Sequence, residues 1–426
     1  MKRRKGGSRA WLDWKSMVIG VLTLLLWTTK RRRHKSDFDL SDRTDVAGMI
    51  PSFVGITEGS FDRGNRVEIL LNGSYFDRLL DDVAQATQSI HIESYIWWTG
   101  EICARLAEGL AKKSAGGVEV RLLVDASGGV TMEPQLVKSM KDAGCQVRFF
   151  HPLRVSNLGR MNNRTHRKIS IFDGRIGYVG GHGIAEQWTG QAQDPKHWRD
   201  TAVRMEGPVI NTLQGVFCEN WIEETGEVPA GPKYFPILTP IGDVDAHVAF
   251  TSPRGSLSAV QLLYYLAIAS AEKELIIQNP YFLPHNDAIE ELKAAVRRGV
   301  DVRVMLPSAA VIDLPSVQHA SHHHYGDLLE NGARVYEYTR TLLHSKVMIV
   351  DRKWCCVGST NFDDRSFQLN DEVTVGFTSP SIATQLYNAY LDDLRHSDEI
   401  HLDAWKARPW YHKLADGVLF LGRKQL

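Results

Sequence analysis

Two short segments of the chain carry the same reactive side chains at the same spacing. They are His166, Lys168 and Asp173 in the first segment, and His344, Lys346 and Asp351 in the second. Side chains alternate along a strand, so each histidine is expected to project from the same side as its lysine. Together the segments could supply one imidazole to attack, one to protonate a leaving group, and two ammonium groups around a phosphoryl group.

The surroundings of the two segments also match, which indicates an internal duplication. In the first half we expect strands at 90–95, 118–125 and 143–150 and a helix at 102–113. The second half repeats this order, with strands at 275–281, 300–306 and 331–338 and a helix at 288–298. Strands that alternate with helices predict α/β layers on a parallel or mixed sheet. A chain of 426 residues with 43% apolar content can hold two such domains, and we expect them to face one shared site.

The two segments and several other phrases make the chain resemble the phospholipase D superfamily, and most closely its bacterial cardiolipin synthases. The phrases are Arg66–Gly73, Ile92–Trp97, Trp198–Pro208, Pro280–Pro284 and Gly358–Ser366, and the resemblance covers roughly residues 64 to 411. It implies two tandem phospholipase D-like α/β/α domains, each a mixed sheet flanked by helices, that share one active site at their interface. The expected division is a tail at 1–40, a first domain at 41–235 and a second at 236–426.

The resemblance also implies a reaction. One histidine attacks a phosphodiester to form a phosphohistidine, and the other protonates the departing alcohol and then activates a second alcohol. In the family the N-terminal motif usually supplies the nucleophile, so we expect His166 to attack and His344 to act as acid and base. The residues alone do not distinguish the two. Lys168 and Lys346 would neutralise the phosphoryl oxygens, and no metal or cofactor is expected.

An attacking imidazole needs an acceptor for its other nitrogen, and relatives use an acid some thirty residues beyond each motif histidine. Asp200 and Glu372 lie 34 and 28 residues beyond His166 and His344, respectively, so we expect Asp200 to orient His166 and Glu372 to orient His344. The alternative is that each acid ends a strand and faces water. Asp173 and Asp351 are expected to support the strands.

The turns that follow the two motifs differ in their polar groups. The second offers Ser359 and Asn361 as hydrogen-bond donors to phosphate, whereas the first has Gly181 and Gly183 at the corresponding places, where relatives commonly keep an asparagine. Bare glycine amides can also bind an anion, so all four are candidate substrate-binding residues.

The N-terminal tail points to a membrane. Residues 1–35 hold 11 basic residues and one acid, and the chain has 50 of each, so the remainder has 39 basic and 49 acidic residues. An acidic body is unsuited to nucleic acid, whereas the basic tail favours anionic lipids. The uncharged stretch 16–29 would form a helix of about 21 Å, short of the ~30 Å hydrocarbon core, so a tilted span and an in-plane anchor both fit. A cytosolic chain with a basic tail is the alternative.

We therefore expect a cardiolipin synthase at the cell (inner) membrane that joins two phosphatidylglycerol molecules and releases glycerol, with its catalytic domains facing the cytoplasm. A phospholipid hydrolase is the nearest alternative, a nucleic-acid phosphodiesterase a more distant one, and a scaffold with a decayed site is disfavoured because both motifs are intact. The oligomeric state stays open.

Four other features have simpler interpretations. The histidines at 319, 322, 323 and 324 resemble a metal cluster, but no acid or cysteine completes it at a suitable spacing, so we expect a polar rim of the substrate channel. The insert at 153–165, with Arg154, Arg160 and Arg164, could guide acidic headgroups or be a solvated loop. The five cysteines form no Cys-x-x-Cys pair and are expected to be reduced. The end at 405–421 could contact the membrane or pack on its own domain.

Overall fold

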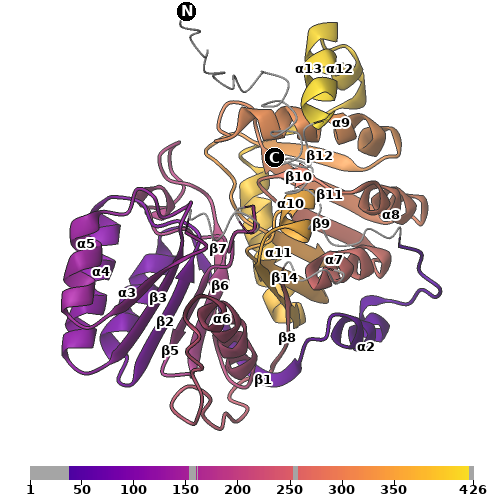
Figure 1. Ribbon diagram of the computed structural model, residues 1–426. Helices are drawn as coiled ribbons and strands as arrows, with labels where there is room; N and C mark the ends of the chain where they lie inside the picture. Colours follow the sequence, from indigo (N-terminus) through magenta and orange to yellow (C-terminus); the bar gives the residue numbers. More distant parts are fainter. Residues whose placement is uncertain (1–37, 153–159, 161, 253–257, 422–426) are drawn as a thin grey trace, which may run out of the picture.

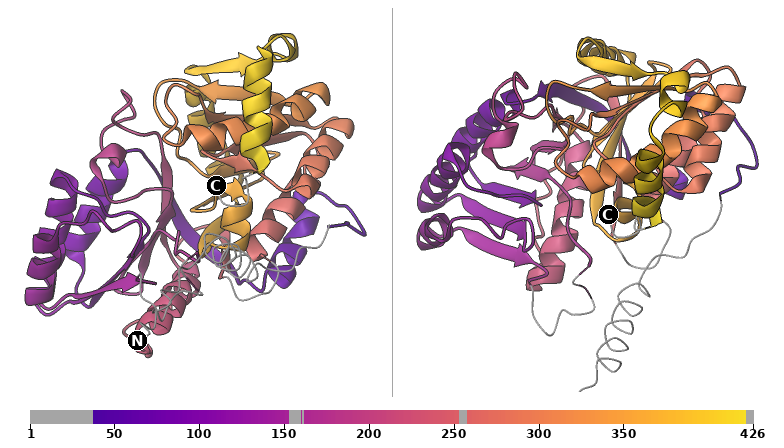
Figure 2. Two further views of the ribbon diagram at one scale, coloured as in Figure 1. Left: turned by 45° about the horizontal axis from the view of Figure 1, so that its top comes forward. Right: turned by 90° about the horizontal axis from the view of Figure 1, so that it is seen from above.

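The computed structural model describes residues 38–152, 160, 162–252 and 258–421, which form two α/β halves that lie side by side (Figure 1). Figure 2 shows the same arrangement from two further sides. The tail at 1–37, including the stretch 16–29 expected to contact the membrane, and Arg154 lie outside the described residues. Within the described part of the chain, no helix is long and apolar enough to span a bilayer.

The first half contains the predicted elements with small shifts of their ends. Its elements are β1 (Phe61–Leu71), α3 (Ser74–Gln85), β2 (Ser89–Ser94), α4 (Glu101–Ala115), β3 (Glu119–Asp125), α5 (Pro134–Asp142), β4 (Gln146–Phe150), β5 (Ile169–Phe172), β6 (Ile176–Gly180), η2 (Glu186–Trp188), β7 (Thr201–Glu206) and α6 (Val209–Thr225). Strand β2 is buried along its whole length because helices cover the sheet, and α4 buries a stripe that includes Ile102, Leu106 and Leu110.

The second half repeats this order and adds a helical end. Its elements are β8 (Val244–Thr251), α7 (Ala259–Ala269), β9 (Glu274–Gln278), β10 (Phe282–Leu283), α8 (Asn286–Arg297), β11 (Asp301–Pro307), α9 (Pro315–Glu330), β12 (Arg334–Tyr338), β13 (Val347–Val350), β14 (Trp354–Gly358), β15 (Phe362–Asp363), α10 (Asp364–Gln368), β16 (Glu372–Thr378), α11 (Pro380–Leu394), β17 (Ser397–Ile400), α12 (Leu402–Lys406) and α13 (Trp410–Leu421).

One mixed sheet runs through both halves. Its strand order is β17-β12-β11-β9-β13-β14-β16-β8-β1-β7-β6-β5-β2-β3-β4, and β10 pairs with β15 separately. Parallel pairs such as β2–β3 and β9–β11 lie toward the outer parts, whereas antiparallel pairing of β1 with β8 joins the halves at the centre. The predicted fold class, two α/β/α repeats on a mixed sheet, is confirmed.

One helix precedes the first half in the sequence but packs against the second half. Helix α2 (Val46–Ile56) precedes β1, yet its buried residues Val46, Met49 and Phe53 join the core formed by α7, β9 and β11. The Phe53 ring packs against Trp354 of β14 at a centroid distance of 5.4 Å. The predicted boundary placed this segment in the first domain, whereas its packing attaches it to the second half.

The two motif aspartates have the same structural role in their halves. Asp173 and Asp351 follow β5 and β13 with φ angles of 53° and 52°, in the left-handed region. Asp173 accepts backbone N–H groups of Thr87, Gln88 and Ser89, and Asp351 accepts those of Glu272, Lys273 and Glu274. Each carboxylate therefore ties its turn to the start of the neighbouring strand, β2 or β9. Burial alone would raise the pKa of Asp173, but the backbone N–H groups lower it overall.

Candidate active site

Each motif histidine lies in an extended segment just before a strand. We expected the histidines and lysines to lie on strands, but β5 and β13 begin directly after Lys168 and Lys346. The backbone before each of these strands bonds instead to the opposite half of the chain. The His166 N–H donates to the Asp371 carbonyl at 2.9 Å, and the His344 N–H donates to the Arg199 carbonyl at 2.7 Å. Short parallel bridges pair Thr165 with Asp371 and Arg199 with Leu343.

These backbone bridges between the halves place each histidine beside the acid of the other half. The Nδ1 of His166 lies 2.9 Å from a Glu372 carboxylate oxygen, and the Nδ1 of His344 lies 2.8 Å from Asp200 Oδ2. The expectation that each acid orients the histidine of its own motif is therefore wrong. The two pairs are crossed because each acid follows the residue that bridges to the opposite motif. Both acids are fully buried, so the alternative of acids facing water is also excluded.

Both histidines line one cavity between the halves. Its volume is about 260 Å³, and it also receives Lys168 and Asn361. The remaining lining residues are Tyr95, Ile96, Trp98, Arg164, Trp198, Tyr281, Asp313, Leu314, Asp363, Arg365, Ser366 and Asn370. Rings hold both imidazoles in place: the Tyr95 ring lies 5.2 Å from that of His166, and the Trp198 ring lies 5.7 Å from that of His344. Two imidazoles thus converge on a site large enough for a phosphodiester.

Burial keeps both imidazoles neutral at physiological pH. Desolvation and, to a smaller extent, nearby Lys168 lower the pKa of His166 to about 4, although Glu372 opposes them. Desolvation and Lys346 lower the pKa of His344 to about 3, although Asp200 opposes them. A neutral imidazole whose Nδ1–H donates to a carboxylate presents a lone pair at Nε2, the form that a nucleophile or general base requires.

The lysines lie against the histidines but differ in their contacts. Lys168 Nζ donates to the His166 carbonyl at 2.8 Å. Lys346 Nζ donates to the His344 carbonyl at 2.7 Å and also lies 3.0 and 3.1 Å from the two ring nitrogens of His344. Desolvation lowers the pKa of Lys168 to about 7 and that of Lys346 to about 8. Two ammonium groups can therefore be present at neutral pH beside a phosphoryl group.

The turns after the motifs hold the acids rather than a phosphate. Ser359 was expected to donate to phosphate, but its Oγ donates to the Glu372 carboxylate, and its side chain is fully buried. In the first half Trp188 Nε1 takes this role and donates to Asp200 Oδ2 at 2.8 Å. Asn361 does line the cavity, and its Oδ1 has no hydrogen-bond partner among the described residues.

The first-half glycines are required by packing. A Cβ on Gly181 would lie 2.3 Å from Asp200 Oδ1, and one on Gly183 would lie 2.9 Å from the Trp188 ring. The glycines therefore make room for the Asp200–Trp188 pair, which replaces the serine-to-acid bond of the second half. This explains the departure from the asparagine that relatives commonly keep.

The Gly181→Ala variant is expected to lose activity because its methyl group must displace the Asp200 carboxylate from His344. We expect the turnover number to fall about 10²-fold, the cost of disturbing a group that orients a reacting residue. Steady-state assays of the purified variant measure this. Gly215→Ala is the matched control, since a Cβ there meets nothing within 4 Å. Equal activities of the two variants would contradict the packing role of Gly181.

Several cavity residues were not predicted individually. Asp313 and Tyr281 face each other, with the Tyr281 hydroxyl 2.8 Å from the Asp313 carboxylate. Burial raises the pKa of Asp313, and it raises that of Asp363 to about 7. Asp363 and Arg365 lie within the Gly358–Ser366 phrase, which was a usable signal. Nothing marked Asp313, which precedes α9 in a loop.

The insert before the first motif contributes one arginine to the cavity. Arg164 lines it, and its guanidinium donates to the His151 carbonyl at 3.1 Å and lies 3.4 Å from Asp125. Arg160 pairs instead with Glu223 at 2.7 Å. Of the two described arginines of the insert, only Arg164 is placed to meet a bound headgroup.

Comparison with known proteins identifies the family. The family model described as "Cardiolipin synthase, PLD-like domain" matches residues 79–207 and 264–394, one match in each half. The cardiolipin synthase of Halalkalibacterium halodurans is 35% identical over 80% of this chain and 68% of its own. The major cardiolipin synthase of Bacillus subtilis is 33% identical over 96% of this chain and 85% of its own.

Solved structures show the same fold at low sequence identity. A phosphatidylserine synthase from Haemophilus influenzae has a TM-score of 0.66 at 12% identity, and covers 89% of this chain and 100% of its own. A polyphosphate kinase from Porphyromonas gingivalis has a TM-score of 0.54 at 13% identity, and covers 84% of this chain and 53% of its own.

Proposed function

Since this chain belongs to the cardiolipin synthases of the phospholipase D superfamily, we propose that it moves a phosphatidyl group between two phosphatidylglycerol molecules through a phosphohistidine, with release of glycerol. The chain is a phosphatidyltransferase whose substrates are phospholipids. The observation that carries the proposed mechanism is the pair of neutral imidazoles in one cavity, each held at Nδ1 by the acid of the opposite half.

In the first step His166 Nε2 attacks phosphorus, and the bond to glycerol oxygen breaks. Glu372 holds the Nδ1–H and stabilises the positive charge that builds on the ring. The contacts of the lysines support this assignment: Lys346 Nζ lies 3.1 Å from His344 Nε2, whereas Lys168 Nζ donates to the backbone carbonyl of His166 and lies over the Tyr95 ring. An ammonium group that donates to the lone pair of an imidazole makes that ring a poorer nucleophile and can pass it a proton for a leaving group.

In the second step the roles at His344 reverse. The departing glycerol takes a proton that the Lys346 ammonium, 3.1 Å from His344 Nε2, passes through the neutral His344 ring. His344 then accepts the proton of the incoming hydroxyl of the second phosphatidylglycerol and returns it to Lys346. That oxygen attacks phosphorus, the bond to His166 breaks, and cardiolipin leaves. Asp200 holds His344 in the required tautomer through both steps. Lys168 stays charged beside the phosphoryl oxygens, and Lys346 is charged before the first step and again after the second.

The pH dependence of kcat/KM should reflect the histidines on the acid side and the lysines on the alkaline side. Neutral His166 is lost as pH falls through about 4, because protonation consumes its lone pair. The ammonium charges are lost as pH rises through about 7 and 8, because burial has lowered the pKa values of Lys168 and Lys346. We therefore expect a plateau between these limits and a decline above it. A profile that stays flat to high alkaline pH would contradict the role of the lysines.

The activity itself is tested with purified protein and labelled phosphatidylglycerol in mixed micelles. Cardiolipin and glycerol in equal amounts are expected. Phosphatidic acid with little cardiolipin would mean that water replaces the second alcohol, which would make the protein a hydrolase. The same preparation should leave single-stranded and duplex DNA intact.

We propose that the enzyme works at the inner face of the cell membrane. Its substrates are lipids, and the 11 basic residues of the tail at 1–35 would favour anionic lipid surfaces. Separation of membranes from soluble protein, followed by protease treatment of sealed vesicles of each orientation, tests both the location and the side.

A further inference from the structure

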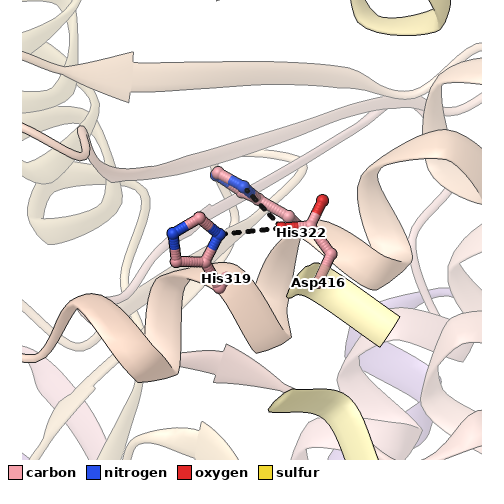
Figure 3. A group of neighbouring side chains, drawn as sticks. All are labelled: His319, His322 and Asp416. Carbon is pink, nitrogen blue, oxygen red and sulfur yellow. Dashed lines mark hydrogen bonds and ion pairs between the residues drawn. The ribbon is translucent and has the colours of Figure 1, made fainter. Parts of the chain in front are cut away.

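Helix α9 carries two histidines whose ring nitrogens point at one buried carboxylate from the C-terminal helix. Figure 3 shows His319 and His322 side by side on α9, with Asp416 of α13 facing them. The Nδ1 of His319 lies 2.9 Å from Asp416 Oδ1, and the Nδ1 of His322 lies 3.6 Å from the same oxygen. One ligand atom from each residue falls within 4.8 Å of the others. Asp416 is the acid that no sequence spacing revealed. Neither histidine is among the residues that line the catalytic cavity, so they do not form the expected channel rim.

His322 and Asp416 present two facing polar atoms between which a cation fits. Its Nε2 lies 3.4 Å from Glu337 Oε1, an arrangement in which Nε2 carries the hydrogen. The Nδ1 faces the carboxylate oxygen of Asp416 at 3.6 Å, and this buried Nδ1 has no hydrogen-bond partner among the described residues, so either a second proton on the ring or a metal ion lies between the two atoms. Two electron-rich atoms opposed in a buried place repel each other unless a positive charge lies between them.

We propose that His319, His322 and Asp416 form a zinc site that fastens α13 to α9. Imidazole nitrogen and carboxylate oxygen bind Zn²⁺ at about 2.0–2.2 Å, and tetrahedral ligands at that radius lie about 3.3 Å apart, between the two nitrogen-to-oxygen distances observed. Two nitrogen ligands disfavour Mg²⁺ and Ca²⁺, which prefer oxygen. Water can fill the fourth position, since the His319 side chain is 34% exposed.

The surroundings match what a bound zinc requires. A histidine that ligates through one nitrogen normally donates its other N–H to an acid, which is the relation between His322 Nε2 and Glu337. Arg408 NH1 donates to Asp416 Oδ2 at 3.1 Å. Both histidines face the other oxygen, Oδ1, which therefore remains for the metal. On binding, the Nδ1 proton of His319 moves to its Nε2 or to water, and both ligands become neutral imidazoles.

The zinc would stabilise one wall of the catalytic cavity. On α13, Leu419 and Phe420 pack against the cluster of Leu283, Val317 and Ala320, and Tyr281 packs against the same cluster. Tyr281 lines the cavity and bonds Asp313. A metal that holds α13 on α9 therefore also holds the residues that support Tyr281, at a distance from the reacting histidines.

Metal binding by the full chain in detergent tests the proposal. After removal of metal with a chelator, equilibrium dialysis against Zn²⁺ at neutral pH should load about one ion per chain, measured by elemental analysis. His319→Ala and Asp416→Asn should each weaken this binding by about tenfold or more. His401→Ala is the control, because His401 is exposed, makes no side-chain capping bond and is not one of the three ligands, and it should bind zinc as the wild type does.

A second readout separates a lost site from a misfolded variant. Zinc should raise the melting temperature of the wild type and of His401→Ala, and should leave that of His319→Ala and Asp416→Asn unchanged, while all four chains unfold in a single transition without metal. Two results would overturn the proposal: no zinc retained by the wild type at micromolar concentration, or equal retention by the wild type and both ligand variants.

Discussion

Replacement of His166 with asparagine is expected to reduce cardiolipin formation by at least about 10⁴-fold, because the side chain then has no nucleophilic nitrogen. Asparagine retains an N–H that can reach Glu372, so the buried acid keeps a partner and the fold is preserved. Single-turnover reactions with labelled phosphatidylglycerol measure the effect on the first step directly. His344→Asn should reduce the rate by about 10²–10⁴-fold, the range of general acid–base catalysis.

An exposed histidine provides the control for this loss. His401 precedes α12 and makes no side-chain capping bond, so His401→Ala should transfer at the wild-type rate. Equal unfolding midpoints in urea would show that the catalytic variants remain folded. Activity of His166→Asn within tenfold of the wild type would contradict a covalent role for this residue.

Substitution of the two acids is expected to separate the two chemical steps according to the crossed pairing. On phosphatidylglycerol, Glu372→Gln and Asp200→Asn should each lose about 10³-fold or more, because the amide no longer fixes the tautomer of its histidine or stabilises its charge. A phosphatidyl ester of p-nitrophenol has a leaving group that departs without a proton. With it, Asp200→Asn should release one equivalent of p-nitrophenol in a burst and then stall, whereas Glu372→Gln should give no burst.

The histidine variants supply the matched pattern. His344→Asn should behave as Asp200→Asn does, and His166→Asn as Glu372→Gln does, since each acid acts through the histidine that it contacts. If Asp200 served the histidine of its own half, Asp200→Asn would lose the burst instead. Stopped-flow absorbance of p-nitrophenol follows all four variants in one experiment.

The elements of the fold could be predicted from the sequence because their patterns are local. The apolar run of β2 and the stripe of α4 are visible without knowledge of the rest of the chain. The attachment of α2 to the second half could not be predicted, because its partners on α7 and β14 lie more than 200 residues away. The start of β5 was misplaced for a similar reason, since the segment before it bridges to Asp371.

In the site, residue types were predictable and partnerships were not. A duplicated chain offers two acids and two histidines of the same kinds, and spacing along the sequence favours the nearer acid for each. Only the bridges Thr165–Asp371 and Arg199–Leu343 decide in favour of the crossed pairs. Nothing in the sequence indicated that Trp188 donates to Asp200 as Ser359 donates to Glu372. The serine lies in the turn after its motif, whereas the tryptophan lies in the short helix η2.

Identification of the covalent intermediate tests the central claim most directly. The enzyme is mixed with the p-nitrophenyl ester, quenched in alkali within one turnover, digested, and its peptides are examined for a phosphatidyl group on histidine. The label is expected on the peptide that contains His166, at its highest level in Asp200→Asn, where the second step stalls. A label on His344 instead, or no labelled histidine while p-nitrophenol is released, would contradict the mechanism.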